Sequence, residues 1–142
     1  MTASVQRQAW WQGQRWRDDR GDASIQMAIV YPFVLLATIA VVQASLWYYA
    51  RQIALTAARE GVFAARAYHA TPTDGVARAQ EVLARTAGDS LRSPAVSTAG
   101  SSTQRVRIQV TGQAQSMIPG LAGLRIRQSA SGAVERWTSP GG

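Results

Sequence analysis

One uncharged apolar run near the N-terminus constrains this chain more than any other feature. Between Asp22 and Arg51 no residue carries a charge, and the run is rich in Ile, Val, Leu and Ala. A bilayer core of ~30 Å is crossed by about 20 apolar residues in a helix, so the run is long enough to span a membrane. Pro32 lies in its first third, where a membrane helix tolerates proline. We therefore predict a polar leader over residues 1–21 and a transmembrane helix over residues 22–50.

Two other interpretations of the run are open. The small-residue sequence at residues 42–44 resembles a signal-peptide cleavage site, although the run exceeds the ~7–15 apolar residues typical of a signal peptide. A buried core helix is disfavoured, because a chain of 142 residues leaves too little protein to surround it. Trp47, Tyr48 and Tyr49 at the end of the run fit an aromatic belt at the far membrane interface.

The helical pattern continues past the membrane segment over residues 51–70. Small and apolar residues there fall on one stripe of a helical wheel, and Arg51, Arg59 and Arg66 fall on another. Small residues let a second helix or a sheet approach the backbone closely. The sequence leaves open whether the partner is the C-terminal part of the chain or another subunit. The predicted packing face consists of Ala54, Ala57, Ala58, Gly61 and Ala65.

Residues 71–142 predict a small domain outside the membrane that begins with a helix. Thr71, Pro72 and Asp74 form a helix start with the spacing of a capping box. Gly88 marks the end of this helix, because glycine is the usual residue just past a helix terminus.

Two later segments predict strands. Residues 105–110 and 124–130 alternate between apolar and polar side chains, as half-buried strands do. Leu124 is expected to face inward. Residues 95–97 suggest a further short strand, and Ile118-Pro119-Gly120 suggests a type II turn. Two strands are marginal alone, so we expect them to lean on the long helix, which gives an α+β fold with a short antiparallel sheet.

Composition excludes several classes of site. The chain has no cysteine and a single histidine, His69, which rules out disulfides, thiolate metal sites and histidine-based metal clusters. No nucleophile elbow, paired-carboxylate signature, glycine-rich phosphate loop or metal-ligand spacing is present. We therefore predict no enzymatic activity, no cofactor, no metal and no small-molecule substrate.

The charge balance suggests one binding function. The net charge is +7 and all fifteen basic residues are arginine, and such a chain is attracted to anionic polymers. Arg105, Arg107, Arg125 and Arg127 share the outer face of the predicted strands. One hypothesis is therefore a membrane anchor whose basic domain binds anionic wall polymer, lipid or DNA. The strands carry no aromatic residues for base stacking, and the arginines could simply solvate the surface.

Four motifs in order give a more specific hypothesis. A charged leader ends in Gly21, and the apolar helix follows at once. Ala57-Ala58-Arg59-Glu60-Gly61, Met117-Ile118-Pro119-Gly120-Leu121 and Gly132-Ala133-Val134-Glu135-Arg136 lie downstream. With these motifs the chain resembles the TadE-like (TadE/TadG) pseudopilin family of the tight-adherence (Flp) pilus system, over about residues 17 to 137. Pro32 falls where the early proline of that family lies.

The resemblance implies a structural component of a pilus or related secretion assembly, with a role in adhesion. It implies cleavage between Gly21 and Asp22 by a prepilin peptidase on the cytoplasmic side. The implied partners are other pilin-like subunits and the assembly machinery. The N-terminus would lie in the cytoplasm, and the C-terminal domain outside the plasma membrane or at the cell surface in a pilus. The alternative is that Gly21 is only a hinge before a membrane anchor.

Two further features lie in the leader and at the start of the apolar run. Gln26 stands where the family has a glutamate, whose carboxylate is thought to pair with the N-terminal amine of a neighbouring subunit. Gln26 can accept a hydrogen bond from an amine but cannot neutralise its charge, which bears on packing into a filament. The leader is also rich in tryptophan. Trp10, Trp11 and Trp16 either rest among lipid headgroups or are recognised by the peptidase.

Overall fold

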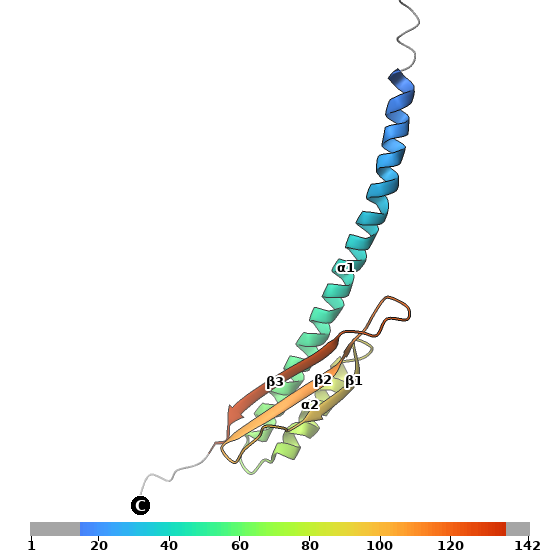
Figure 1. The fold of residues 1–142 in the computed structure, drawn as a ribbon. Helices are drawn as coiled ribbons and strands as arrows, with labels where there is room; N and C mark the ends of the chain where they lie inside the picture. Colours follow the sequence, from blue (N-terminus) through green and yellow to red (C-terminus); the bar gives the residue numbers. More distant parts are fainter. Residues whose placement is uncertain (1–14, 136–142) are drawn as a thin grey trace, which may run out of the picture. The chain divides into compact units, whose positions relative to one another are not determined.

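The computed structural model describes residues 15–135 and has two helices and three strands in that range (Figure 1). It confirms the predicted fold class, with a long apolar N-terminal helix, one further helix and an antiparallel sheet. The elements are α1 (Arg15–Ala65), α2 (Pro72–Thr86), β1 (Leu91–Ser97), β2 (Arg105–Ala114) and β3 (Arg125–Ala133). The chain divides into two compact units, Met1–Val41 and Val42–Gly142. Trp10 and Trp11 of the leader lie outside the described residues.

The first unit contains only α1 among its described residues. The helix continues through Pro32 without interruption, and every residue from 23 to 41 is exposed. Thr38 donates its hydroxyl to the carbonyl of Val34 at 2.8 Å, so this polar group is satisfied within the helix. The helix begins at Arg15 and passes through Gly21 instead of starting after it. Residues 15–20 contain no helix breaker, and a single glycine costs a helix only about 1 kcal/mol.

The second unit contains a three-stranded antiparallel sheet with β2 in the centre. Each strand is longer than the sequence pattern predicts. The largest difference is in β1, which begins at Leu91 although the pattern suggests a strand only over residues 95–97. The pairing shifts between Arg92 and Ala95, where Ser93 adopts a φ of 47°. This bulge accommodates Pro94, which cannot donate to a regular ladder.

The predicted orientation of Leu124 is wrong. Leu124 lies just before β3 and is 56% exposed, because it belongs to the end of the β2–β3 loop. Its carbonyl accepts a hydrogen bond from the backbone nitrogen of Ala114 at 2.9 Å. The turn prediction is confirmed, since the nitrogen of Leu121 donates to the carbonyl of Ile118 at 3.2 Å and Gly120 adopts a φ of 79°.

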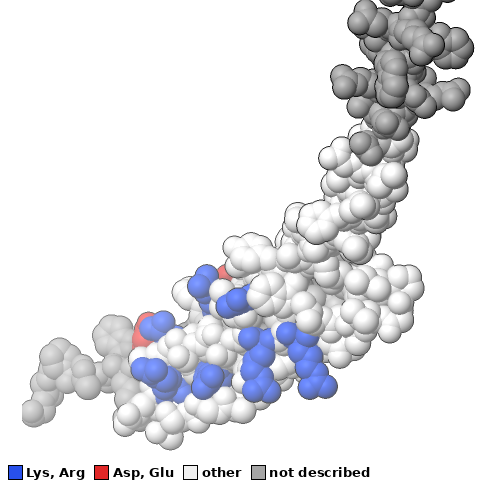
Figure 2. All heavy atoms as spheres, turned by 45° about the horizontal axis from the view of Figure 1, so that its top comes forward, with Lys and Arg blue, Asp and Glu red and all other residues white. Residues whose placement is uncertain are grey.

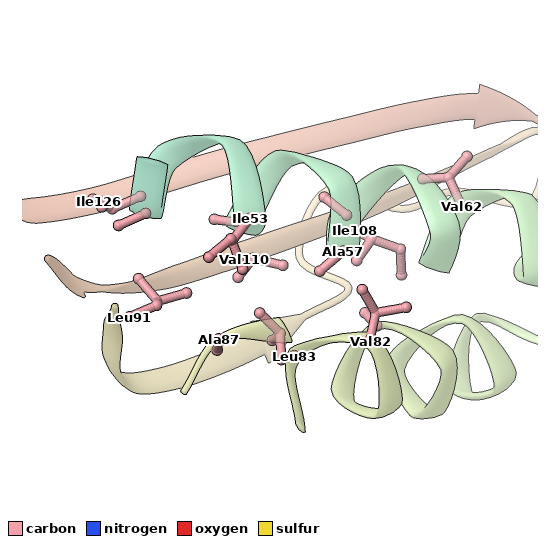
Figure 3. Close-up of a cluster of buried hydrophobic side chains, with 14 of the residues drawn as sticks. Ile53, Ala57, Val62, Val82, Leu83, Ala87, Leu91, Ile108, Val110 and Ile126 are labelled. Atoms are coloured by element: carbon pink, nitrogen blue, oxygen red, sulfur yellow. The ribbon is translucent and has the colours of Figure 1, made fainter. Parts of the chain in front are cut away.

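The core lies between one face of the sheet and the two helices (Figure 3). Side chains from β2 meet side chains from the C-terminal part of α1 and from α2. Ile108 is fully buried and lies beside both Gly61 of α1 and Gly75 of α2, which places the two helices on the same face of the sheet. The labelled side chains of this cluster are Ile53, Ala57, Val62, Val82, Leu83, Ala87, Leu91, Ile108, Val110 and Ile126.

The start of α2 is a complete capping box, as the sequence predicts. The backbone nitrogen of Asp74 donates to the Thr71 hydroxyl at 3.3 Å, and the Asp74 carboxylate accepts from the backbone nitrogen of Thr71 at 2.6 Å. The Thr71 hydroxyl also donates to this carboxylate at 2.7 Å. The hydrogen bonds from the backbone and side chain of Thr71 lower the pKa of Asp74.

This lowered pKa predicts a specific loss of stability in acid. The capping box contributes fully above the ordinary aspartate pKa of about 3.9 and is lost as the pH falls through the lower pKa of the folded state. The Asp74→Asn variant has no titratable group at this position, so the thermal midpoint of the wild type should fall toward that of the variant as the capping carboxylate is protonated below about pH 4. Circular dichroism of the full chain in detergent measures this. Parallel curves for the two proteins between pH 3 and 7 would contradict the role of the carboxylate.

Candidate functional site

The predicted processing site lies near the beginning of α1. Gly21 and Asp22 are both within the helix. A Cβ added to Gly21 would meet no atom within 4 Å, so packing within the chain does not explain the glycine. Gln26 is exposed, and Pro32 lies inside the helix.

The apolar part of α1 in the first unit exposes large hydrophobic side chains on all sides. Ile29, Phe33 and Leu36 are each about two-thirds exposed or more, at 69%, 72% and 66%. An 18-residue window of this helix has a mean hydropathy of 2.3, and none of that window is buried. Such a surface is unfavourable in water. The length and composition of the helix are those of a membrane span.

The predicted packing face lies against the chain's own domain. Ala54, Ala57, Ala58, Gly61 and Ala65 are all buried. The closest approach is between Gly61 of α1 and Gly75 of α2. A Cβ on Gly61 would lie 2.7 Å from the carbonyl oxygen of Gly75, and a Cβ on Gly75 would lie 2.6 Å from the carbonyl oxygen of Gly61. The two backbones therefore touch where the helices cross, and only glycine permits this at either position.

The remainder of the Ala57–Gly61 motif also joins α1 to α2. Glu60 forms an ion pair with Arg78 of α2 at 3.2 Å, and Arg78 forms a second ion pair with Glu81 at 3.0 Å. Hydrogen bonds to Glu81 and to Glu60 raise the pKa of Arg78. The ion pair between Glu60 and Arg78 is half-exposed, and solvent screens such pairs. It therefore helps to orient the two helices but adds little to the stability of the domain.

The C-terminal motif packs on the end of the same helix. A Cβ on Gly132 would lie 2.6 Å from the side chain of Arg66 and 3.0 Å from Val62. Arg66 donates to the carbonyl of Ala133 at 2.6 Å and forms an ion pair with Glu135 at 3.6 Å. Gly132 and Glu135 therefore tie β3 to α1, and Arg136 lies outside the described residues.

The four predicted arginines share one face of the sheet but form two pairs. Arg105 and Arg107 lie at one end of β2, opposite Ala133 and Ser131 of β3. Arg125 and Arg127 lie opposite Gln113 and Thr111, at the other end. Arg107 also donates to the hydroxyl of Ser129 at 3.2 Å. All four arginines are exposed.

Sequence reasoning missed a fifth arginine on this face. Arg92 of β1 lies opposite Gln113, so it occupies the same register row as Arg125. Pro94 interrupts the alternation of β1, and no pattern in the sequence marks Arg92 as a strand residue. The outer face of the sheet carries no carboxylate, and Figure 2 shows basic side chains gathered on this side of the molecule. None of the five forms an ion pair with a side chain that the structure describes.

The described part of the chain contains no candidate metal site. No group of three His, Asp or Glu residues converges there in a way that could hold a metal ion. His69 lies in the turn between α1 and α2 and stacks edge-on against Tyr68 at 3.9 Å. Neither observation assigns any chemistry to residues 15–135.

The fold and the surface define a class of protein: a single-pass membrane protein in which α1 is the one described helix that could span a bilayer, and its C-terminal part belongs to a small α+β domain. Residues 21–62 match the family model for TadE-like protein. The match confirms the resemblance to this family over the apolar helix and its packed extension. It ends before the two C-terminal motifs. No curated protein and no solved structure matches the chain.

The glycine crossing of α1 and α2 makes a prediction about stability. Gly61→Ala and Gly75→Ala should each destabilise the domain by about 1–3 kcal/mol, because the new methyl group meets a backbone carbonyl that cannot move freely. The gain in helix propensity, about 1 kcal/mol, opposes this only in part. Denaturant unfolding of the full chain in detergent measures the effect.

Gly21→Ala is the matched control, since its Cβ meets nothing within 4 Å. It should unfold at the wild-type denaturant concentration. Wild-type stability of both Gly61→Ala and Gly75→Ala would show that the two backbones are not in contact.

Proposed function

We propose that this chain is a TadE-like minor pilin or pseudopilin, cleaved after Gly21 by a prepilin peptidase. It would serve as a structural component of a tight-adherence type pilus or a related secretion assembly. The observation that carries the proposal is that the family match starts at the predicted processing site. The family match over residues 21–62 begins at the glycine and covers the bare apolar helix together with the segment packed into the domain. No enzymatic role enters the proposal.

The bare helix supports a role in assembly. Every residue from 23 to 42 is exposed. In a bilayer such a helix is free to pack sideways against other pilin-like helices through van der Waals contact. The small residues of α1 from Ala54 to Ala65 are already used by its own domain. We therefore place subunit contacts of α1 in its apolar part, with the N-terminus cytoplasmic and the domain outside the plasma membrane.

Gln26 supports a minor component over a repeated filament subunit. Cleavage after Gly21 leaves a positively charged amine at Asp22, and Gln26 lies one helical turn further on. The Gln26 amide can accept a hydrogen bond from a neighbour's amine, but it brings no opposite charge. An ammonium without a carboxylate on the neighbouring subunit is costly in a low-dielectric environment, and the carboxylate of Asp22 itself can compensate for it only in part. The cost recurs at every subunit of a shaft, but only once for a subunit at the tip, at the base or within the membrane.

The position of Gly21 in α1 is compatible with cleavage. The helix begins at Arg15, so the bond after Gly21 is within two turns of the helix start. Helix ends open locally at small free-energy cost, and glycine lowers the cost further because it favours the unfolded chain. We infer that the first turns unwind to present this bond to a peptidase.

The five arginines favour a second candidate function. Their shared face carries no carboxylate, which suits binding to anionic wall polymer, lipid headgroups or DNA. Under this alternative the protein is a bitopic anchor, and Gly21 is a hinge that is not cleaved. The two functions differ in what happens at the N-terminus and in the role of the sheet.

Cleavage after Gly21 is tested by the intact mass and N-terminal sequence of the membrane-extracted protein. With a prepilin peptidase co-expressed, the chain should begin at Asp22; without it, the leader should remain. Gly21→Leu should abolish cleavage, because a bulky side chain next to the cut bond obstructs the peptidase. Ala28→Leu adds a bulky side chain about two helical turns downstream and should be cleaved normally. A leader retained by the wild type in the presence of the peptidase would refute processing.

Binding by the sheet is tested by retention on an anionic matrix. Under the alternative, changing Arg105, Arg107, Arg125 and Arg127 to Ala should lower the salt concentration at which the full chain elutes, since exposed charge contacts are screened by salt. Arg125→Ala/Arg127→Ala removes the same charge as Arg59→Ala/Arg85→Ala on the helices, so it should elute clearly earlier than that control. Equal elution of the two double variants would attribute retention to net charge alone.

A further inference from the structure

The β2–β3 loop, residues 115–124, is an apolar segment whose large side chains are exposed. It contains no charged residue. Met117, Leu121 and Leu124 are 61%, 62% and 56% exposed, and Ile118 is 41% exposed. Large apolar side chains gathered at one exposed loop indicate a contact surface more strongly than scattered ones do. The loop extends past the end of the sheet (Figure 1).

The loop has a defined conformation. The hydrogen bond from Ala114 to Leu124 closes its base at 2.9 Å, and the turn at Ile118 closes its tip. A Cβ on Gly123 would collide with the carbonyl oxygen of Ala114, so the two sides of the loop lie against each other. A loop closed in this way presents its apolar side chains without the entropy cost of ordering them on contact.

Two hydrogen bonds hold this loop to α1 at Gln43. The Gln43 amide donates to the carbonyl of Gln115 at 3.2 Å and accepts from the backbone nitrogen of Met117 at 3.1 Å. One side chain therefore satisfies a donor and an acceptor of the loop backbone. This matters in an apolar environment, where an unpaired backbone group is costly.

Gln43 lies inside the uncharged run of α1, not beyond it. Counted from Asp22, about 20 helical residues cross a hydrocarbon core of ~30 Å and end near Gln43. Trp47, with Arg51 stacked at 5.5 Å from its ring, follows one turn later at the depth expected for headgroups. The loop is thus bound to the helix at the edge of the hydrocarbon, closer to the membrane centre than the aromatic belt.

We propose that the β2–β3 loop inserts its apolar side chains into the outer leaflet, so that the domain rests on the membrane surface. Arg92 and Arg125 flank Gln113 at the base of the loop. From there they can reach lipid phosphates, which supports lipid as the occupant over an apolar protein surface. The inference rests on the membrane span of α1 and does not depend on cleavage or on pilus assembly.

The absence of cysteine allows a direct test of depth. Single spin labels are placed at Leu121→Cys in the loop, at Leu36→Cys in the apolar helix and at Thr103→Cys. Thr103 is exposed in the β1–β2 connection, at the opposite end of β2. The full chain is reconstituted in vesicles of phosphatidylcholine and phosphatidylglycerol. Accessibility is measured to oxygen, which concentrates in lipid, and to a water-soluble nickel complex.

The label at residue 121 should lose nickel accessibility and gain oxygen accessibility relative to residue 103, as the label at residue 36 should. Nickel accessibility at 121 equal to that at 103, with 36 in lipid, would overturn the insertion and leave the membrane span intact. Protection of residue 121 from both reagents would mean that protein covers the loop, and would also overturn it. Nickel access at both 36 and 121 would refute the span itself.

A second variant tests the role of Gln43. Gln43→Leu keeps the helix apolar but removes both hydrogen bonds to the loop. In this background the label at residue 121 should gain nickel accessibility and mobility, while the label at residue 36 should not change. Unchanged values at 121 would overturn the claim that Gln43 holds the loop at the membrane.

Discussion

The contact between Gly61 and Gly75 is the constraint on which the domain depends. With no side chain on either residue, α1 and α2 approach until backbone meets backbone, and both helices then fit under a single strand at Ile108. A three-stranded sheet can cover two helices only if they lie this close, because neighbouring strands are about 4.8 Å apart. The alanines that surround the crossing on α1 follow from the same requirement. They contribute little side-chain volume, and the core is built from backbone proximity and from the apolar face of β2.

A single helix therefore carries two kinds of surface, and its composition changes where the environment changes. Large residues such as Phe33 and Leu36 occupy the part that the chain leaves bare. Small residues from Ala50 onwards occupy the part that the domain covers. Bulky apolar side chains gain most from lipid, whereas alanine and glycine allow close packing against protein. The family match covers the bare stretch and most of the packed one, and it ends at Val62.

Regular periodicity made most of the fold predictable, and its local exceptions account for the errors. The apolar run, the capping box at Thr71 and the alternation in β2 each depend on short-range patterns, and each appears in the structure. Most of β1 was not predicted because Pro94 interrupts its pattern. The bulge that accommodates this proline depends on the pairing with β2 and not on the sequence of β1 itself. Leu124 faces outward because the loop ends one residue later than the alternation suggests. Of the candidate site, the basic face was predictable except for Arg92, whose place follows from that same bulge.

No pattern in the sequence predicts the contact of Gln43 with the β2–β3 loop. Its two partners in the loop are separated from it by 72 and 74 positions along the chain. Its consequence is nevertheless simple. Residues 43–65 of α1 contact the domain without a linker, first through this amide, then through Trp47 and then through the buried alanines. These contacts all lie within the second unit, so the β2–β3 loop, Trp47 and the buried alanines of α1 belong to one packed body. The amide of Gln43 is the polar end of that body, and the alanines are its apolar centre.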